Sequence, residues 1–378
     1  MKRYIININL LFVIVIILAF CKCETDNVDA NHKRNTEAYT GKKAKNIIFM
    51  IGDGMGIAQI HAGMIANHGK LNLGKCKYIG FIKTSSADNY ITDSGAGGTA
   101  FATGVKTNNG AIGVDINGQP QKTILEIAED NGLATGLIST SAITHATPAS
   151  FIAHQLSRDM YEEIAADFLE TDVDVIIGGG KTHFANRSDG INLVEKFQGN
   201  GYSMYSDVKD ITNKNNNKLI CFTADGHNPR YSEGRGDMLP NATMAAINIL
   251  KQNEKGFFLM VEGSFIDWGG HANDIDYIVE EVLDFDRAVG KALEFAAQDG
   301  NTLVIITADH ECGGMTITGG NIETGEVQAT FSTTNHTAVM VPVFAYGPGG
   351  ETFTGVYENN IIFNKLNKAF GFSESNKY

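Results

Sequence analysis

The stretch that decides the fold is NIIFMIGDGMG, residues 46–56 of the chain. An uninterrupted apolar run, Ile47–Ile51, leads directly into Gly52, Asp53 and Gly54. A run without a polar position is typical of a strand buried on both faces of a parallel sheet. Glycine and aspartate also favour turns, so this ending by itself could be no more than a strand-to-helix turn. Parallel sheets, however, form their sites outside the carboxyl ends of the strands, and we expect Asp53 to lie there.

Runs of the same kind recur along the chain. They are rich in Val, Ile and Phe and comprise Tyr78–Ile82, Leu133–Ile138, Val173–Ile177, Phe257–Val261, Leu303–Thr307 and Val341–Tyr346. Helical patterns lie between them, as in Lys122–Asn131, which Gly132 follows, and in the apolar stripe of Asp274–Asp299. The alternation predicts an α/β fold with a largely parallel central sheet flanked by helices on both faces.

The length and composition fit one large domain over residues 46–378. The chain has 378 residues, of which 43% are hydrophobic, and this suffices for a sizeable core. Within the domain, residues 181–239 are polar, rich in asparagine and poor in strand-like runs. We expect that stretch to be an inserted polar subregion or a long loop rather than a second catalytic domain.

The N-terminus indicates export. Lys2 and Arg3 precede the apolar run Leu10–Phe20, which suits a signal peptide over residues 1–23 and is short for a membrane span. Cys21 and Cys23 follow where a bacterial lipoprotein signal places its lipidated cysteine. An ordinary signal peptide and an uncleaved membrane anchor are the alternatives. Residues 24–45 form a polar linker, and we expect a periplasmic protein or a lipoprotein anchored to the membrane by lipid.

The formal net charge of -13 limits the classes of partner. An acidic surface argues against nucleic acid and against anionic membrane as a binding partner. It would also repel an anionic substrate, unless bound cations reversed the sign of the charge locally.

Chemically active residues follow several predicted strands. Asp53 follows the first of these strands, Ile47–Ile51. The run Leu133–Ile138 is followed by Thr144, His145 and Thr147; the run Phe257–Val261 is followed by Glu262, Asp267 and His271; and the run Leu303–Thr307 is followed by Asp309 and His310. Each group could be a turn or a hydrogen-bonded pair on its own, but together these readings require four coincidences at one edge. Carboxylates with imidazoles suit Zn²⁺, and an oxygen-only subset suits Mg²⁺, so we expect a metal cluster.

A second pattern, TDSGAGGTA at residues 92–100, places Ser94 at the start of a helix of small residues. Its hydroxyl would lie near the positive end of the helix dipole. Close helix packing explains the glycines but gives Asp93 and Ser94 no role. Because no GxSxG motif is present, a metal is the more economical activator of this serine.

Taken together, these residues resemble the successive motifs of bacterial alkaline phosphatases. The motifs occur in order from residue 46 almost to the C-terminus: NIIFMIGDGMG, TDSGAGGTAFATG, SAITHATPASFIAH, EGSFIDWGGHAND, TADHECGG and STTNHT. The chain is most similar to the compact, cold-active branch of the family, in which a tryptophan occupies the place of Trp268. The resemblance implies a phosphomonoester hydrolase that acts through a phosphoserine at Ser94, on small-molecule substrates, and as a homodimer.

The resemblance also implies two zinc ions and one magnesium ion. Their ligands would be Asp267, His271 and His336 for the first zinc, Asp53, Asp309 and His310 for the second zinc, and Asp53, Thr147 and Glu262 for the magnesium. Arg158 would grip two phosphate oxygens with its planar fork, whereas its sequence context alone suggests a solvated helix charge.

The chain departs from the best-known family pattern at two positions that lie next to the implied ligands rather than among them. His145 stands where some members have Asp, and Trp268 where some have Lys or His, which affects magnesium affinity and phosphate binding rather than the reaction. We expect Cys312 to be a packed thiol, because the implied ligand set is already complete.

Three alternatives to a phosphomonoesterase come from the same residues. A sulfatase would carry a Pro and Arg signature after its nucleophile, whereas Gly-Ala-Gly follows Ser94. A phosphodiesterase of this group usually has a threonine nucleophile and lacks the arginine. A non-catalytic surface lipoprotein that binds phosphate or metal would keep the ligands but lose Ser94.

Overall fold

The computed structural model describes residues 41–211 and 217–372, and the predicted signal peptide and most of the linker lie outside the described residues. A ten-stranded sheet has the order β14-β2-β13-β8-β1-β7-β3-β4-β6-β5. Its strands are β1 (Asn46–Gly52), β2 (Tyr78–Lys83), β3 (Ala134–Ala142), β4 (Val175–Gly179), β5 (Ser203–Tyr205), β6 (Leu219–Phe222), β7 (Phe257–Gly263), β8 (Thr302–Thr307), β13 (Val341–Tyr346) and β14 (Gly355–Glu358).

The sheet is parallel around the strand that the opening motif predicts. β1 pairs in parallel with β7 on one side and with β8 on the other, and every residue of β1 is buried. The pairs from β7 through β3, β4 and β6 to β5 are parallel as well. β13 runs antiparallel to both of its neighbours. The prediction of a largely parallel sheet is therefore confirmed.

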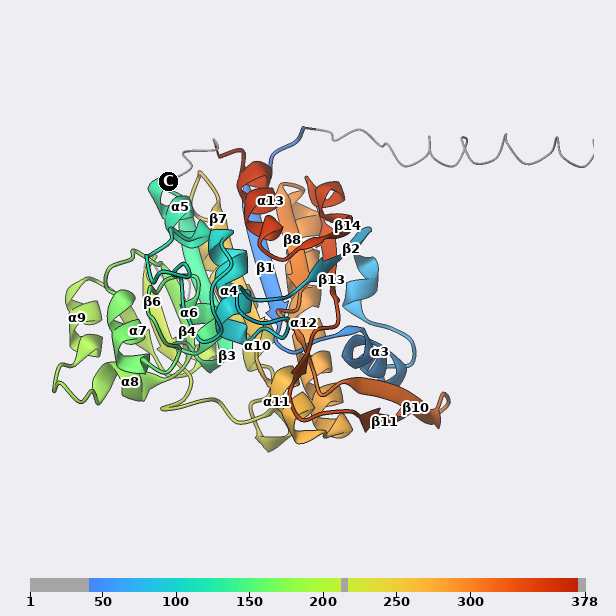
Figure 1. Ribbon diagram of the computed structural model, residues 1–378. Helices are drawn as coiled ribbons and strands as arrows, with labels where there is room; N and C mark the ends of the chain where they lie inside the picture. Colours follow the sequence, from blue (N-terminus) through green and yellow to red (C-terminus); the bar gives the residue numbers. More distant parts are fainter. Residues whose placement is uncertain (1–40, 212–216, 373–378) are drawn as a thin grey trace, which may run out of the picture. The chain divides into compact units, whose positions relative to one another are not determined.

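Helices cover both faces of this sheet (Figure 1). On one face α4 (Ser94–Thr103) packs with α5 (Ile124–Asp130), α6 (Ala146–Ala149) and α13 (Ile361–Phe370). On the other, α10 (Met238–Leu250) and α12 (Ile275–Asp299) pack together, and α12 also contacts α3 (Ile57–Ala66) and α11 (Phe265–Ala272). The remaining elements are α7 (Tyr161–Asp167), α8 (Lys181–Ala185), α9 (Leu193–Gly199), η1 (Asn72–Lys75), η2 (Val208–Asp210), η3 (Tyr231–Glu233), η4 (Gly350–Phe353), and the two-stranded sheets β10 (Met315–Asn321) with β11 (Glu326–Phe331) and β9 (Glu311–Cys312) with β12 (His336–Thr337).

Both predicted helices begin and end as their sequences indicate. Thr123 and Glu126 form a capping box at the start of α5, and Gly132 lies just beyond its end with φ +74°. At α12, the side chain of Asp274 accepts hydrogen bonds from the first turn, and Gly300 closes the last turn in the left-handed conformation.

One predicted strand is less buried than its sequence indicates. Tyr78–Ile82 was expected to be apolar on two buried faces, but Gly80 and Ile82 are buried while Ile79 is 50% exposed. β2 lies next to the edge strand β14, and alternate side chains of a strand point to opposite faces. One face of β2 is therefore exposed.

Residues 181–239, expected as an inserted subregion or long loop, contribute to the main sheet. β5 and β6 from this stretch form its last two strands, next to β4. The run Leu219–Phe222 is buried throughout, but at four residues it is too short to stand out from polar surroundings. The stretch also contains α8 and α9, which pack on each other at this end of the sheet (Figure 1).

A buried ion network joins the end of this stretch to α12. Arg235 has a side chain only 1% exposed, and its guanidinium contacts Glu281 and lies 2.8 Å from Oδ2 of Asp284. The backbone N–H of Tyr231 also donates to Glu281 at 2.8 Å. The side-chain exposures of Glu281 and Asp284 are 2% and 1%. Removal of Arg235 would leave the buried carboxylate of Glu281 without a counter-charge and Asp284 with Arg287, whose Nη2 lies 2.8 Å from Oδ1 of Asp284.

We expect Arg235→Ala to lower the free energy of unfolding by about 3–5 kcal/mol, the usual cost of removing one partner from a buried ion pair. Arg230→Ala is the matched control. It lies in the same segment, is 35% exposed and contacts carboxylates at 3.4–3.9 Å, so its loss should cost about 0–1 kcal/mol. Denaturant unfolding of both variants measures the difference, and equal losses would contradict the argument.

Candidate active site

The predicted site residues meet at one edge of the sheet. Asp53 directly follows β1, and Glu262 lies on β7 opposite Ile51. Asp309 and His310 follow β8, which pairs with the other side of β1. The close approach depends on Gly54, which has φ +71° and where a Cβ would lie 2.6 Å from Cα of Asp267 on α11.

An inner group of possible metal ligands consists of Asp53, Asp309 and His310, all buried. Nε2 of His310 lies 3.4 Å from Oδ1 of Asp53 and 3.2 Å from Oδ2 of Asp309. Both of these oxygens are buried and have no hydrogen-bond partner. Unpartnered carboxylate oxygens around an imidazole nitrogen are costly in the protein interior unless a cation is bound, so the inner group fits a metal ion.

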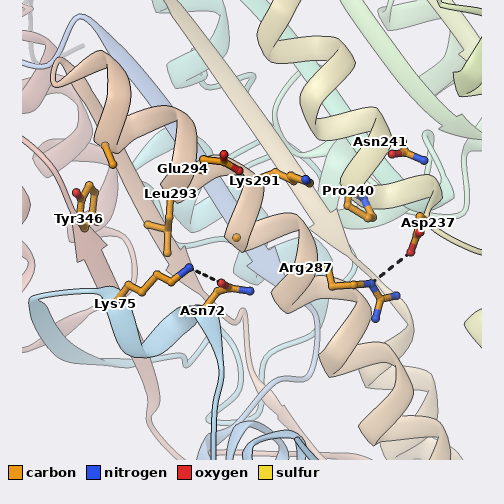
Figure 2. A pocket seen from close by; sticks show the side chains of 12 residues that line it. Asn72, Lys75, Asp237, Pro240, Asn241, Arg287, Lys291, Leu293, Glu294 and Tyr346 are labelled. Atoms are coloured by element: carbon orange, nitrogen blue, oxygen red, sulfur yellow. Dashed lines mark hydrogen bonds and ion pairs between the residues drawn. The ribbon is translucent and has the colours of Figure 1, made fainter.

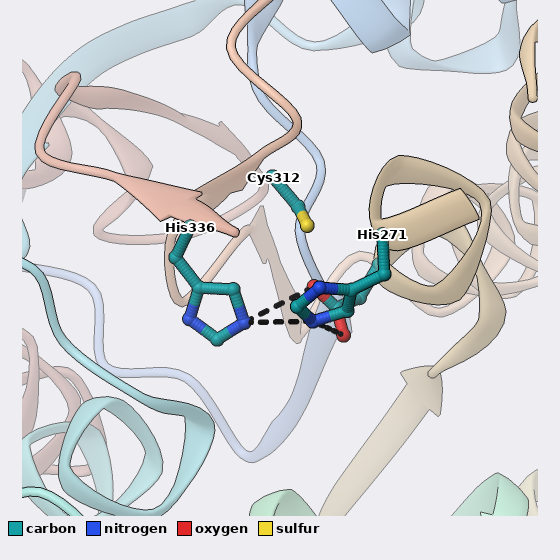
Figure 3. Close-up of side chains that lie close together, drawn as sticks. His271, Cys312 and His336 are labelled. Atoms are coloured by element: carbon teal, nitrogen blue, oxygen red, sulfur yellow. Dashed lines mark hydrogen bonds and ion pairs between the residues drawn. The ribbon is translucent and has the colours of Figure 1, made fainter. Parts of the chain in front are cut away.

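An outer group consists of Asp267 and His271 on α11 together with His336 on β12 (Figure 3). Nδ1 of His271 lies 2.6 Å from the carbonyl oxygen of Thr334, and Nδ1 of His336 lies 2.8 Å from that of Thr92. Because a carbonyl only accepts hydrogen bonds, these contacts place a proton on each Nδ1 and leave each Nε2 available to a metal.

The two free nitrogens of the outer group face each other. They are 3.2 Å apart, and they lie 3.2 and 3.4 Å from the two carboxylate oxygens of Asp267. Nitrogens and a carboxylate that converge in this way, with their outer atoms held by backbone carbonyls, suit a zinc site.

A third group of possible ligands combines Asp53, Glu262 and His145. Ser139 donates to Oε2 of Glu262 at 2.6 Å, while Oε1 of Glu262 is buried without a hydrogen-bond partner. Thr147 is also buried nearby, on α6 directly after His145 and Ala146. The oxygens of Asp53, Glu262 and Thr147 suit a hard cation.

Burial and mutual repulsion disfavour the charged forms of these carboxyl groups. Burial raises the pKa of Glu262 to about 7, although hydrogen bonds from Ser139 and other hydroxyls act to lower it. Burial, followed by the negative charge of Asp267, raises the pKa of Asp309 to about 6. Burial and then three neighbouring carboxylates raise the pKa of Asp53 well above its usual range. Cations bound among these groups would restore their charged forms.

Ser94 lies against the inner group. It is the first residue of α4 and only 2% exposed, and its Oγ lies 3.3 Å from Oδ2 of Asp53 and 3.3 Å from Nε2 of His310. The hydroxyl therefore touches two residues of the inner group. Gly98 of α4 also permits close packing, because a Cβ there would lie 2.9 Å from Oγ of Ser150.

Arg158 is held near Ser94 by Asp93, the residue that directly precedes Ser94. Asp93 caps α4 by accepting from the N–H of Ala96 at 2.9 Å, and its other oxygen lies 2.9 Å from Nη1 of Arg158. Arg158 lies in a turn before α7, with a side chain 23% exposed. It is therefore neither helical nor simply solvated, in contrast to what its sequence context suggests.

His145 is a neutral neighbour of Arg158. Burial, and then the positive charges of Arg158 and His227, lower its pKa to about 3. Nη2 of Arg158 lies 3.2 Å from its Nε2, and because guanidinium only donates, the ring proton must be on Nδ1. With one nitrogen occupied and the other protonated, His145 offers no lone pair to a cation in this arrangement.

Trp268 lies in an aromatic cluster that sequence reasoning missed. Its ring packs edge-to-face against His145 at 6.3 Å, His227 at 4.9 Å and Phe265 at 4.3 Å between ring centroids. His227 is exposed and accepts a hydrogen bond from the N–H of Ala142. It comes from the polar stretch 181–239, in which no motif marks it.

A separate hollow of about 680 Å³ lies between α10, α12 and η1 (Figure 2). Lys75, Arg287 and Lys291 line it together with Asp237 and Glu294. None of the predicted site residues lines this hollow, and its mixed charges favour no single class of ligand.

A buried serine hydroxyl at a helix N-terminus, metal-ligand groups around it and an arginine beside it define a metal-dependent hydrolase that works by phosphoryl transfer. A family model described as alkaline phosphatase matches residues 44–330. The chain belongs to the alkaline phosphatase family and is a metal-dependent phosphomonoesterase, as the resemblance of its motifs indicated.

Individual relatives agree over most of the chain. Alkaline phosphatase 4 of Bacillus subtilis is 36% identical, over 88% of this chain and 92% of its own. The structure of alkaline phosphatase from the Antarctic bacterium TAB5 has a TM-score of 0.85 and 45% identity, over 88% of this chain and 100% of its own. A variant of that enzyme with a histidine replaced by glutamate, which has magnesium bound in a metal site, has a TM-score of 0.84 and 44% identity, over 88% and 99% of the two chains.

Proposed function

We propose that Ser94 is the nucleophile of this phosphomonoesterase, with zinc in the outer and inner groups and magnesium in the third. The observation that carries the proposal is the contact of the Ser94 hydroxyl with Asp53 and His310, at 3.3 Å each. When bound, the metal ions lower the pKa of the hydroxyl and neutralise charge that develops on phosphate oxygens. Asp267, His271 and His336 would hold the first zinc, Asp53, Asp309 and His310 the second, and Asp53, Thr147 and Glu262 the magnesium.

The residues of the chain perform two displacements. Oγ of Ser94 forms a bond to phosphorus while the bond to the leaving alcohol breaks, and the serine proton passes to solvent or to the leaving oxygen. The oxygen of a water molecule then forms a bond to phosphorus while the bond from phosphorus to Oγ of Ser94 breaks, and a proton from that water returns to Oγ, so that inorganic phosphate is released. Arg158, held in place by Asp93, donates from its two terminal nitrogens to phosphate oxygens. His145 is neutral, so Arg158 is the member of this pair whose positive charge attracts the phosphate.

The experiment that tests the reaction class is a comparison of three aryl substrates. We expect hydrolysis of an aryl phosphate and much slower hydrolysis of the matching aryl sulfate and aryl phosphodiester. Preference for the sulfate or the diester would favour the alternatives set out above, and inactivity of a metal-loaded protein on all three would favour a non-catalytic binding protein.

We also propose export and a homodimer. The N-terminal residues 1–23 support export, either as a periplasmic protein or through lipid on Cys21 or Cys23, and the family supports the dimer. Among the described residues no helix is long and apolar enough to cross a membrane. Mass spectrometry of the mature N-terminus and size-exclusion chromatography with light scattering test these two proposals.

Removal of the metals should abolish hydrolysis. Chelation would leave the buried carboxylates without counter-charges and Ser94 without an activator. We expect zinc together with magnesium to restore activity, and magnesium alone to fail because the histidine-containing sites suit zinc. Full activity in protein shown by elemental analysis to be metal-free would rule out the mechanism.

Ser94→Ala should remove the phosphoserine and lower kcat by several orders of magnitude, as deletions of other nucleophiles do. Because Ser94 belongs to none of the three ligand groups, the metal content of the variant protein should be unchanged. The measurement is acid quenching after incubation with a labelled substrate. Label that remains attached to the variant would assign the nucleophile elsewhere.

Arg158→Ala should weaken competitive inhibition by inorganic phosphate. A charged hydrogen bond contributes about 1.5–3 kcal/mol, which corresponds to roughly a 10- to 150-fold rise in the inhibition constant. Arg158→Lys is the matched control, because it keeps the charge but loses the planar fork. Its inhibition constant should lie between those of the unaltered enzyme and of Arg158→Ala. An inhibition constant unchanged in both variants would return Arg158 to the role of a surface charge.

His145→Glu should increase magnesium affinity in the third group. A carboxylate would add a hard, charged ligand next to Asp53 and Glu262, where the neutral histidine offers none. We expect the dissociation constant for magnesium to fall by at least about tenfold in zinc-loaded protein. His61→Glu, on the exposed side of α3, is the control for added charge. Equal magnesium affinity in both variants would contradict the assignment of this site.

A further inference from the structure

Cys312, which we expect from the sequence to be a packed thiol, also lies beside the outer group. It is fully buried and forms no disulfide with the other cysteines of the described residues. Cys312 belongs to β9 and is the direct partner of His336 in the antiparallel pair with β12. Directly paired residues in such a ladder project from the same face. The sulfur and the imidazole therefore both face Asp267 and His271 (Figure 3).

The sulfur completes a set of four donor atoms. Sγ of Cys312 and one ligand atom each from Asp267, His271 and His336 all lie within 4.8 Å of one another. Metal bonds of about 2.0–2.3 Å place tetrahedral donors roughly 3.3–3.8 Å apart, so the atoms need to approach by only about an ångström. Asp267 is only 5% exposed. Its Oδ1, one of the atoms near this set of donors, is buried and has no hydrogen-bond partner.

The backbone around Cys312 fixes the position of the sulfur. A Cβ on Gly270 of α11 would lie 2.9 Å from Sγ of Cys312, so only glycine admits the sulfur at this distance from the helix. The N–H of Cys312 donates to the carbonyl oxygen of Gly54 at 3.3 Å. The same two elements supply metal ligands, because Gly54 follows Asp53 and Gly270 precedes His271.

We propose that Cys312 is a fourth protein ligand of the metal in the outer group. The proposal rests on the outer metal site of the proposed function. On binding, the S–H bond breaks, its proton leaves to solvent and a metal–sulfur bond forms. Zinc in catalytic sites can take a fifth ligand, so the sulfur does not exclude a substrate oxygen. A thiolate makes the outer site select soft ions such as Zn²⁺, Co²⁺ and Cd²⁺ over Mg²⁺.

Cobalt substitution tests the metal–sulfur bond directly, because Co²⁺ bound to a thiolate shows a near-ultraviolet charge-transfer band that oxygen and nitrogen ligands do not give. We expect this band in the full chain loaded with Co²⁺. Cys312→Ser should lose it, and should bind zinc at least about tenfold more weakly in competition with a chelator. Cys221→Ser, a buried cysteine on β6, is the matched control and should keep both.

A further variant keeps the test decisive if Cys312→Ser does not fold. Replacement of Cys21, Cys23, Cys76 and Cys221 by serine leaves Cys312 as the single thiol among the five cysteines of the chain, and the band should survive. Loss of the band there, or a band that persists in folded Cys312→Ser, would overturn the proposal. Zinc-restored hydrolysis without any cobalt–thiolate band would overturn the sulfur ligand while leaving the proposed function intact.

Discussion

Repulsion between buried carboxylates is the interaction on which the rest of this site depends. Asp53, Glu262, Asp267 and Asp309 lie together in the interior, each 5% exposed or less. Burial, followed by repulsion from neighbouring carboxylates, raises the pKa values of Asp53, Glu262 and Asp309, and cations are the means to keep these three groups charged. The neighbouring histidines instead hold the pKa of Asp267 well below its usual range. Bound metals also resolve the conflict between a chain of net charge -13 and an anionic substrate, because they reverse the sign of the field at the site.

The parallel sheet is what brings these groups together. β8, β1 and β7 are neighbours with the same direction and aligned registers, so residues just past their ends must share one edge. Gly54 then allows α11 to approach Asp53 without a side chain between them. On the other side of the site, the N-terminus of α4 presents Ser94 to Asp53 and His310. Ser94 thus begins a helix, and Asp53 and His310 lie just past the ends of two neighbouring strands. Regular elements on both sides hold the geometry of the site better than long loops would.

A second set of contacts orients the ligands. Backbone carbonyls of Thr92 and Thr334 fix the protonated nitrogens of two histidines, and Ser139 holds one oxygen of Glu262. Asp93 joins the cap of α4 to Arg158, so the helix that begins with Ser94 also positions the guanidinium of Arg158. Outer contacts of this kind set the ring orientation and basicity of metal ligands.

The sequence by itself determined the parts that rest on local pattern. Apolar runs predicted β1, β7 and β8 because continuous burial leaves no polar positions. Residues just past these strands, such as Asp53 and Asp309, were predicted to meet because the carboxyl ends of parallel strands share one edge of the sheet. Resemblance to a family, rather than spacing, singled out His336 and Arg158. Only the tertiary structure decided that β5 and β6 extend the sheet, that Asp93 and His227 adjoin the site, and that Cys312 faces the outer metal group. Those relations join segments far apart in the chain, and local pattern encodes burial and turns but not which distant segments meet.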